Sequence, residues 1–508
     1  MSQVKRIPLQ VSLHQSIRHW ATYQPEKPAL IEDDTSVSYR ALQCGVSKCR
    51  ALISDLHLNR QTPVGILVSD KSKLIAAVSA ALAEGHVPVL LNLCLESRIL
   101  QSMISDACCK AAIVDSAGEL LLAGASSHCL PRISVPDLTA DNLRMEDDRQ
   151  GAERFVDDEW GIIYSSGTTG APKGIVRSDL SMFTELVGWC LELPITRNSI
   201  AFIGRPVYYT GGLVLTAATL LVGGSAILPH EWSVTIYKSF MSTNVVDFAF
   251  LIPDQVRELI RKKLTDASHW AGPRRILTMG APMPESLKRS VQEVLKCDYI
   301  ESWGNSEGLG TITSECDAKA RPSSIGRPFL SDELFVVDED ARQLPTGSIG
   351  RIAGYADSVL TKYQNREDLD RRFIRDRMVI SEDLGYVGSD GYFYLAGRVS
   401  QRIVRKGEPI FATDIENIIT CMDGVREVAV SGMDDATEGQ VPVAAVALKT
   451  ETSQYRDEFL ALANSKLLPQ QRLKRVYFLS ELPRNAAGKV DYAALKERLD
   501  SLNQSSCQ

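Results

Sequence analysis

The stretch from residue 64 to residue 91 constrains the fold most strongly. Residues 64–68 (VGILV) form a continuous apolar run with the length of a buried strand, residues 71–83 follow as a helix, and residues 88–91 form a second apolar run. Consecutive buried strands joined by a helix are typical of a parallel sheet covered by helices. The alternation recurs at residues 201–203, 225–228, 247–251, 275–278 and 299–302. The sequence therefore predicts an α/β fold built on parallel-rich sheets.

The length of the chain predicts more than one domain. A chain of 508 residues exceeds what one hydrophobic core usually supports. Short strands and turns crowd residues 326–354, which predicts a small β-rich subdomain. We place a boundary near Val399 and expect a large N-terminal domain, 1–398, and a small, mobile α+β domain, 399–508. For the last part of the chain we expect strands at 392–395, 427–431 and 441–448, helices at 412–422 and 455–463, and then a polar terminal segment.

Composition excludes several classes of protein. The net charge of -7 argues against a nucleic-acid binder, which normally has a basic domain or stripe. No run approaches the ~18 apolar residues of a membrane span, and the N-terminus lacks the apolar core of a signal peptide. The eleven cysteines show no CxxC spacing and the seven histidines show no metal-ligand spacing. We predict reduced thiols, a cytoplasmic location and no nucleic-acid partner.

A glycine-rich segment, YSSGTTGAPKG at residues 164–174, follows directly on an apolar strand. Bare backbone lets N–H groups approach phosphate oxygens, while hydroxyls donate further hydrogen bonds and a cation offsets the charge. The segment is not a Walker A loop, because no GxxxxGK[ST] pattern fits it. A flexible Ser/Gly linker is the alternative, which Pro172 and the flanking strand disfavour. We expect Lys173 to supply the cation and these residues to bind phosphate: Ser165, Ser166, Gly167, Thr168, Thr169 and Gly170.

This segment resembles the phosphate loop of the adenylate-forming superfamily, which comprises acyl-CoA synthetases, firefly luciferase and peptide-synthetase adenylation domains. The resemblance continues in the same order through seven further motifs, at residues 206–212, 279–282, 301–307, 324–328, 381–385, 397–398 and 482–489. One such motif would be weak, whereas eight in order are specific. The resemblance implies an enzyme that joins a carboxylic acid to AMP as an acyl adenylate, using ATP and Mg²⁺, and then passes the acyl group to a second nucleophile.

The resemblance also implies roles for individual residues. Lys489, in PRNAAGK, is expected to bridge the carboxylate and α-phosphate oxygens, and with Lys173 it forms the predicted catalytic pair. Glu307 is the predicted Mg²⁺ ligand, because a carboxylate is a hard oxygen donor. Asp383 is suited to the ribose hydroxyls and Arg398 to the same sugar or the phosphate. Glu307 could instead be a surface acid, and Asp383 and Arg398 could form a structural ion pair.

Further positions are expected to contact the nucleotide or the acid. Trp303 is expected to offer an aromatic face, with a core tryptophan as the alternative. The predicted nucleotide contacts, besides the phosphate loop, are Gly280, Ala281, Pro282, Ser302, Trp303, Gly304, Asn305 and Ser306. The predicted acid pocket comprises Tyr209, Thr210, Gly211, Gly212, Gly304 and Gly308. The motif at 207–212 contains no aspartate to pair with an ammonium group, which favours an uncharged aryl, alicyclic or fatty acid.

Two departures from the family pattern leave the acceptor open. Ser400 stands at the predicted hinge, where relatives usually have aspartate or lysine. Lys406 and Gly407 stand where two glycines border the acceptor tunnel of many CoA ligases. The first hypothesis is therefore a ligase that uses CoA. The second is an amide ligase that uses an amino acid or amine, similar to coronafacate-type ligases. A catalytically silent binding protein is a third reading, which the retention of the charged motif residues disfavours.

Overall fold

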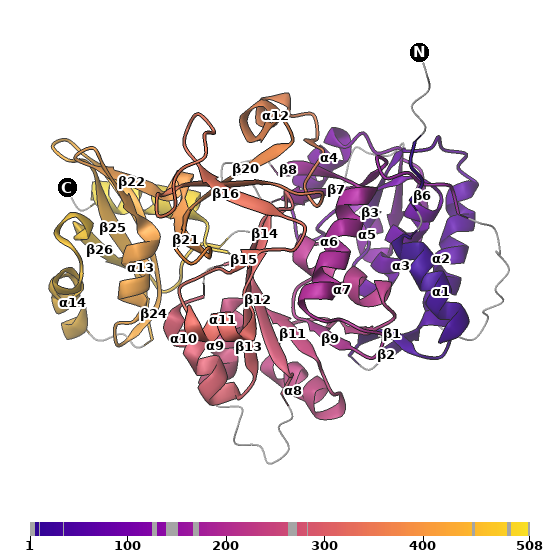
Figure 1. Ribbon diagram of the computed structural model, residues 1–508, viewed down its shortest axis with the longest axis horizontal. Helices are drawn as coiled ribbons and strands as arrows, with labels where there is room; N and C mark the ends of the chain where they lie inside the picture. The colour runs from indigo at the N-terminus through magenta and orange to yellow at the C-terminus, as the bar shows by residue number, and fades with distance from the viewer. Residues whose placement is uncertain are drawn as a thin grey trace.

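The computed structural model describes residues 6–9, 11–33, 35–123, 130–138, 151–165, 172–262, 272–281, 283–449, 453–484 and 489–505. Four sheets organise the chain (Figure 1). The α/β class predicted from the sequence is confirmed. Among the described residues, no helix has the length and apolar character needed to cross a membrane.

The first sheet contains the predicted strand–helix–strand unit. Its parallel pairs include β3 with β4 and β3 with β5, while β7 and β8 run antiparallel. Helix α3 (Lys71–Ala83) joins β3 to β4, and the Asp70 side chain caps it by accepting from the Lys73 N–H at 2.8 Å. The strand order is β18 (Lys362–Tyr363), β8 (Lys173–Ser178), β7 (Glu159–Ser165), β4 (Val87–Leu90), β3 (Pro63–Leu67), β5 (Ala111–Val114) and β6 (Arg132–Ser134).

The second sheet has nine strands, and its centre is parallel. The five recurrent runs predicted as strands all lie in it, as β9, β10, β11, β12 and β13. The strand order is β15 (Arg327–Pro328), β14 (Gly310–Ile312), β13 (Asp298–Gly304), β12 (Arg275–Met279), β11 (Phe248–Leu251), β9 (Ile200–Ile203), β10 (Ser225–Ile227), β1 (Pro28–Glu32) and β2 (Thr35–Ser38).

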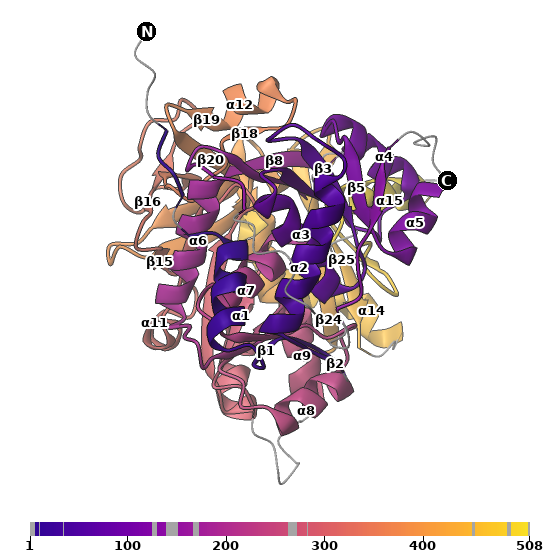
Figure 2. The ribbon, with the colours of Figure 1, turned by 90° about the vertical axis from the view of Figure 1, so that its right-hand side faces the viewer.

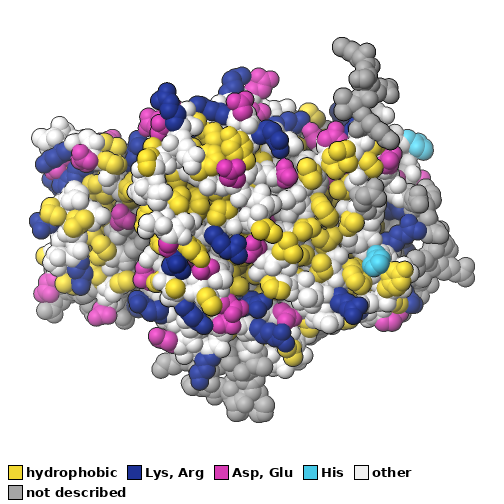
Figure 3. Space-filling model, in the orientation of Figure 1, with side chains coloured by type: hydrophobic (Ala, Val, Ile, Leu, Met, Phe, Trp, Pro, Cys, Tyr) yellow, Lys and Arg dark blue, Asp and Glu magenta, His cyan; other side chains and the backbone are white. Residues whose placement is uncertain are grey.

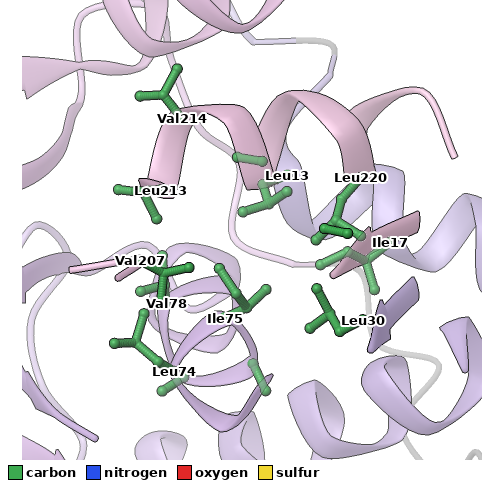
Figure 4. Close-up of a cluster of buried hydrophobic side chains, with 14 of the residues drawn as sticks. Leu13, Ile17, Leu30, Leu74, Ile75, Val78, Val207, Leu213, Val214 and Leu220 are labelled. Atoms are coloured by element: carbon green, nitrogen blue, oxygen red, sulfur yellow. The ribbon is translucent and has the colours of Figure 1, made fainter. Parts of the chain in front are cut away.

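An extensive hydrophobic core joins these two sheets through the helices α1 (Leu13–Tyr23), α2 (Tyr39–Ser54), α3, α6 (Asp179–Glu192) and α7 (Thr210–Leu221). Figure 4 shows side chains of α1, α3 and α7 meeting in it, and Figure 2 shows α1, α2 and α3 side by side. The buried face of α1 supplies Ile17, α3 supplies Ile75 and α7 supplies Leu213. The remaining helices of this part are α4 (Ser97–Asp106), α5 (Ser116–Ala123), α8 (Val234–Thr243), α9 (Pro253–Arg261), α10 (Glu285–Ser290), α11 (Glu315–Ala320) and α12 (Glu367–Phe373).

The third sheet contains one strand that we had assigned to the C-terminal module. The predicted strand at 392–395 belongs to β21 (Phe393–Arg398), which we expected to open the C-terminal module. Instead β21 pairs antiparallel with β20 (Met378–Val387), because the two strands are neighbours in sequence and form a hairpin. The sheet is completed by β16 (Glu333–Val337), β17 (Gly350–Tyr355) and β19 (Ile374–Arg375). The β-rich region predicted at 326–354 therefore extends to Arg398.

The fourth sheet and its helices form the end of the chain. Its core contains Ile403, Ile415 and Phe459 and draws only on residues after Ser400 among those described. Its elements are β23 (Glu408–Phe411), β22 (Arg402–Arg405), β25 (Gly439–Leu448), β24 (Val425–Asp435), β26 (Arg475–Phe478), α13 (Ala412–Thr420), α14 (Ser453–Lys466) and α15 (Tyr492–Ser505). Helix α15 replaces the predicted polar terminal segment, because Leu495 and Leu499 on one face of it are buried.

The chain passes from the third sheet to the fourth through a short 3₁₀ turn, Val399–Gln401. Separate sheets with separate cores on the two sides of this turn support the division that we propose, 1–398 and 399–508. Figure 1 shows the fourth sheet with α13 and α14 at one end of the molecule and α1–α3 at the opposite end. On the face drawn in Figure 3, basic and acidic side chains are interspersed rather than gathered by sign.

Candidate active site

One cavity of about 560 Å³ collects most of the residues predicted from the sequence. Its walls come from β7, β8, the turn before α7, the ends of β12 and β13, the third sheet and the C-terminal module. The predicted residues that line it are Ser165, Lys173, Tyr209, Thr210, Gly211, Gly280, Ala281, Ser302, Trp303, Gly304, Asn305, Ser306, Glu307, Gly308, Asp383, Arg398 and Lys489. Residues spread over more than 300 positions of sequence thus face one space.

Several predicted residues lie outside the described part of the chain. These are Ser166, Gly167, Thr168, Thr169 and Gly170 of the phosphate loop, and Pro282 of the adenine-facing turn. The described ends of that loop, Ser165 on β7 and Lys173 on β8, are register partners at the cavity wall. The phosphate-binding role of the loop stays a prediction.

Gly212 differs from its predicted place in the acid pocket. It is buried at the start of α7 and does not line the cavity. A Cβ atom at this position would lie only 2.4 Å from the backbone oxygen of Pro206. Gly212 is therefore required for the close packing of the turn that presents its neighbour Gly211 to the cavity.

The predicted tunnel residues Lys406 and Gly407 also lie away from the cavity. They form the tip of the hairpin between β22 and β23, with φ of +53° and +84°. The Lys406 Nζ lies 3.5 Å from a carboxylate oxygen of Glu438 within the same module. Ser400, the predicted hinge, is exposed in the turn Val399–Gln401 and does not line the cavity either.

Lys489 reaches the cavity from the C-terminal module. A Cβ atom placed on Gly280 would lie 3.9 Å from its Nζ, so the bare glycine, at φ +95°, leaves room for the lysine. The Lys489 side chain is exposed to the space of the cavity, while protein atoms lie densely around the side chain. This desolvation lowers the pKa of Lys489 to about 8, with the charges of Arg398 and Arg205 adding to the shift and that of Asp383 opposing it. A lysine in this position can be both a cation and a proton donor near neutral pH.

An ion pair connects the C-terminal module to the large part of the chain. Arg484, five residues before Lys489, lies 3.2 Å from the carboxylate of Asp254 on α9. It also lies 3.0 Å from Glu427 on β24 of its own module. The arginine therefore joins the large part of the chain to the strand that precedes the lysine segment.

Asp383 is oriented by two donors. Trp303 Nε1 donates to its Oδ2 at 3.0 Å, and Arg398 Nε donates to its Oδ1 at 2.7 Å. Asp383 and Arg398 are register partners on β20 and β21, which fixes the pair by sheet geometry. The ion pair foreseen as an alternative is thus present. Each carboxylate oxygen can still accept another hydrogen bond from the cavity side. Trp303 is a core tryptophan whose indole N–H positions this carboxylate.

Glu307 lies between a tyrosine and a lysine. Tyr363 donates its hydroxyl to Glu307 Oε1 at 2.9 Å. Burial raises the pKa of Glu307, while Tyr363 and the positive charge of Lys173 oppose the shift. Among the described residues no group of three His, Cys, Asp or Glu side chains could hold a metal ion. A single carboxylate fits Mg²⁺, which is usually held by one or two carboxylates together with phosphate oxygens and water.

Tyr209, the residue before α7, lies in the part of the cavity that we expect to bind the carboxylic acid substrate. Asn92 donates to its hydroxyl at 3.3 Å, and the guanidinium of Arg205 lies 4.6 Å from its ring centroid. Thr210 Oγ1 donates to Ser306 Oγ at 3.4 Å, which joins this side to the β13 motif. Burial lowers the pKa of Arg205, with Tyr209 and Tyr208 opposing the shift.

Sequence reasoning missed several residues of the cavity wall. Arg205 directly precedes the motif at 206–212, so its charge was a signal that could have been used. The others come from segments without a recognisable motif: Glu185, Gly188 and Trp189 on α6, and Phe329 and Asp332 after β15. The motif at 207–212 has no acid, but the cavity holds Glu185 and Asp332 from elsewhere. The expectation of an uncharged acid, which rested on this motif alone, did not take these two carboxylates into account.

Two family models match this chain. The model of the AMP-binding enzyme family matches residues 17–363, and that of the AMP-binding enzyme C-terminal domain matches residues 414–489. A 2-succinylbenzoate–CoA ligase of Bacillus mycoides is 25% identical over 489 residues, covering 94% of this chain and 97% of the ligase.

Solved structures share the fold. The o-succinylbenzoate coenzyme A synthetase MenE of Bacillus subtilis, in complex with ATP and magnesium ion, has a TM-score of 0.84 at 23% identity, with 97% and 100% of the chains covered. The amide bond synthetase McbA of Marinactinospora thermotolerans has a TM-score of 0.86 at 20% identity, with 96% and 100% covered. With a family model matching well over half of its length, the chain belongs to the AMP-binding enzyme family.

Proposed function

We propose that this protein is an AMP-forming acid ligase that activates a small carboxylic acid with ATP and then transfers the acyl group to CoA. The observation that carries the proposal is the position of Lys489. Its side chain extends from the C-terminal module into the cavity that Glu307, Asp383 and Gly280 also line. This arrangement supports the joining of two anions, because a cation stands where their charges must approach.

In the first step, a carboxylate oxygen attacks the α-phosphorus, the bond to the β-phosphate oxygen breaks, and pyrophosphate leaves. Lys489 would donate to the oxygens on which negative charge accumulates. Asp383 would accept from the ribose hydroxyls, held in place by Trp303 and Arg398. Glu307 would hold Mg²⁺, which neutralises phosphate charge when bound.

In the second step, the acceptor attacks the acyl carbon and AMP leaves. A thiol acceptor gives a thioester, and the amine of an amino acid gives an amide. CoA is the acceptor named for the Bacillus mycoides relative, which supports CoA. The fold likeness to McbA, together with a lysine at position 406 in place of a tunnel glycine, supports the amide alternative.

We propose the cytoplasm as the location of the protein. The nine described cysteines are all free, which supports a reducing compartment.

Mass spectrometry of the products tests the proposal. The protein would be incubated with ATP, Mg²⁺ and a panel of carboxylic acids, with CoA in one set and mixed amino acids in the other. We expect acid-dependent AMP and pyrophosphate, and an acyl-CoA in the first set. If an amide forms in the second set and no thioester forms in the first, the acceptor is an amine rather than CoA. No acid-dependent AMP with any acid would contradict the proposed ligase.

The hinge provides a separate prediction. Lys489 lies in the cavity wall, whereas the predicted tunnel residues Lys406 and Gly407 lie away from the cavity at an exposed hairpin tip, so this arrangement brings the lysine but not the predicted tunnel to the cavity. We propose that the module rotates about Val399–Gln401 between the two steps. Ser400→Pro would fix φ near -65° and so restrict the rotation. One half-reaction is expected to persist and the other to fall about tenfold or more.

Pyrophosphate exchange measures the first half-reaction, and acyl transfer from a chemically supplied adenylate measures the second. Ser400→Ala is the control, because it removes the hydroxyl and leaves the backbone free to turn. If Ser400→Pro lowers both half-reactions equally, or changes neither, Ser400 is not the pivot.

A further inference from the structure

Part of the cavity wall is an aromatic patch, formed by Trp189 of α6 and Phe329 of the loop after β15. The rings of Trp189 and Phe329 lie 4.9 Å apart in an edge-to-face arrangement. Two glycines pack against the Phe329 ring, since a Cβ at Gly188 would lie 3.5 Å from it and one at Gly310 only 2.9 Å. The aromatic patch therefore suits contact with an apolar group of the substrate. These residues have no part in the phosphate chemistry described above.

A carboxylate, that of Asp332, stands in this part of the cavity wall. Ser331 Oγ and Ser358 Oγ donate to its Oδ1 at 3.0 and 3.4 Å. The Ser358 hydroxyl also lies 3.1 Å from the backbone oxygen of Gly308, a residue of the predicted acid pocket. Both side-chain hydrogen bonds reach the same oxygen. A carboxylate offers about four lone-pair sites, so the group can accept further donors from the cavity.

No Lys, Arg or His side chain within the described residues forms an ion pair with Asp332, and the nearby acid is already neutralised. Glu185 on α6 lies 2.7 Å from Arg177, which is fully buried. Burial raises the pKa of Asp332 to about 6 and the charge of Glu185 adds to the shift, while hydrogen bonds from Ser331, Ser358 and the Gly310 N–H oppose it. Among the described residues, this corner of the cavity thus holds two carboxylates and one arginine, and the arginine pairs with Glu185 rather than with Asp332.

We propose that the acid substrate carries a hydrogen-bond donor, such as an amine, a hydroxyl or a ring N–H, away from its carboxylate, and that Asp332 accepts it. The inference rests on the proposed function, which places the carboxylate of the substrate at Lys489. An apolar group beside Asp332 would add no donor to those that the protein supplies, so part of the hydrogen-bonding capacity of this desolvated carboxylate would stay unused, which is costly. A site built to accept a hydrogen bond discriminates strongly against the analogue that lacks the donor. Asp332 would therefore set the choice of acid.

Matched acids test the inference with the whole protein. Acid-dependent ATP–pyrophosphate exchange would be measured with 4-(aminomethyl)benzoate, 4-(hydroxymethyl)benzoate and 4-ethylbenzoate, which have similar shapes. The same three substituents would be tested on longer aryl-alkanoic acids. We expect the donor-bearing members of the preferred series to exceed the ethyl member in kcat/KM by about 10–100-fold.

Asp332→Leu is expected to remove or reverse this preference, whereas Asp332→Asn, which keeps an acceptor oxygen, should retain part of it. Glu333→Gln is the matched control, because this neighbouring acid is exposed on β16. The ratio between acids is measured within each variant, so a general loss of folded protein does not alter it. A wild-type preference for the ethyl members, or a preference that Asp332→Leu leaves unchanged, overturns the inference and leaves the ligase intact. Absence of exchange with every acid overturns the ligase and the inference with it.

Discussion

Replacing Lys489 by alanine is expected to lower adenylate formation by about 10²–10³-fold or more. The ammonium group enters the cavity beside Gly280. Its removal leaves the oxygens of the carboxylate and the α-phosphate without the cation that offsets their charge during attack. ATP–pyrophosphate exchange with a productive acid measures this step directly.

Two comparisons make the Lys489 prediction specific. ATP binding by Lys489→Ala, measured by calorimetry, should change little, because most of the predicted nucleotide contacts belong to the large part of the chain. Lys496→Ala, which removes an exposed lysine on α15 of the same module, should leave exchange unchanged. Near-normal exchange by Lys489→Ala would remove this residue from the mechanism.

The pH dependence of exchange supplies an independent readout of the same residue. The surroundings lower the pKa of Lys489 from 10.5 to about 8, so its positive charge is present below that pH and is lost as the pH rises through it. We expect kcat/KM to fall on the alkaline side with an apparent pKa near 8. Lys489→Arg, which stays charged, should lose this limb of the profile even if its rate is low.

Replacing Glu307 by glutamine is the second change for which we expect a large loss. The substitution keeps the shape of the side chain and an oxygen that can accept from Tyr363, but it removes the negative charge. If Glu307 holds Mg²⁺, the Mg²⁺ concentration needed for half-maximal exchange should rise steeply, and the rate at saturating Mg²⁺ should fall about 10²-fold. A Mg²⁺ titration of exchange measures both quantities.

Tyr363→Phe separates a metal role from a structural role for Glu307. This variant removes the hydrogen bond at 2.9 Å and keeps the carboxylate. It should therefore retain the wild-type Mg²⁺ dependence and show at most a loss of stability. If Glu307→Gln shows the same Mg²⁺ dependence as the wild type, Glu307 is a structural acid.

The sequence by itself determined the local elements and the residues of the motifs. Apolar runs of strand length and helical periodicity depend only on neighbouring residues, and α3 has the predicted bounds of Lys71–Ala83. Motif residues such as Asp383, Glu307 and Lys489 could be named because their spacing within short segments is distinctive. All three line the same cavity.

Only the tertiary structure decided which residues outside the recognised motifs line the cavity together with the motif residues. Asp332 and Glu185 stand 147 positions apart in the sequence, and no local pattern indicates that α6 and the loop after β15 meet at the acid side of the cavity. Gly212 shows the converse: its motif was recognised, yet the backbone of Pro206 occupies the space beside it. Local patterns fix what each segment forms, whereas contacts between distant segments depend on how whole sheets and helices pack. The choice of acid therefore depends on residues that the motifs do not identify.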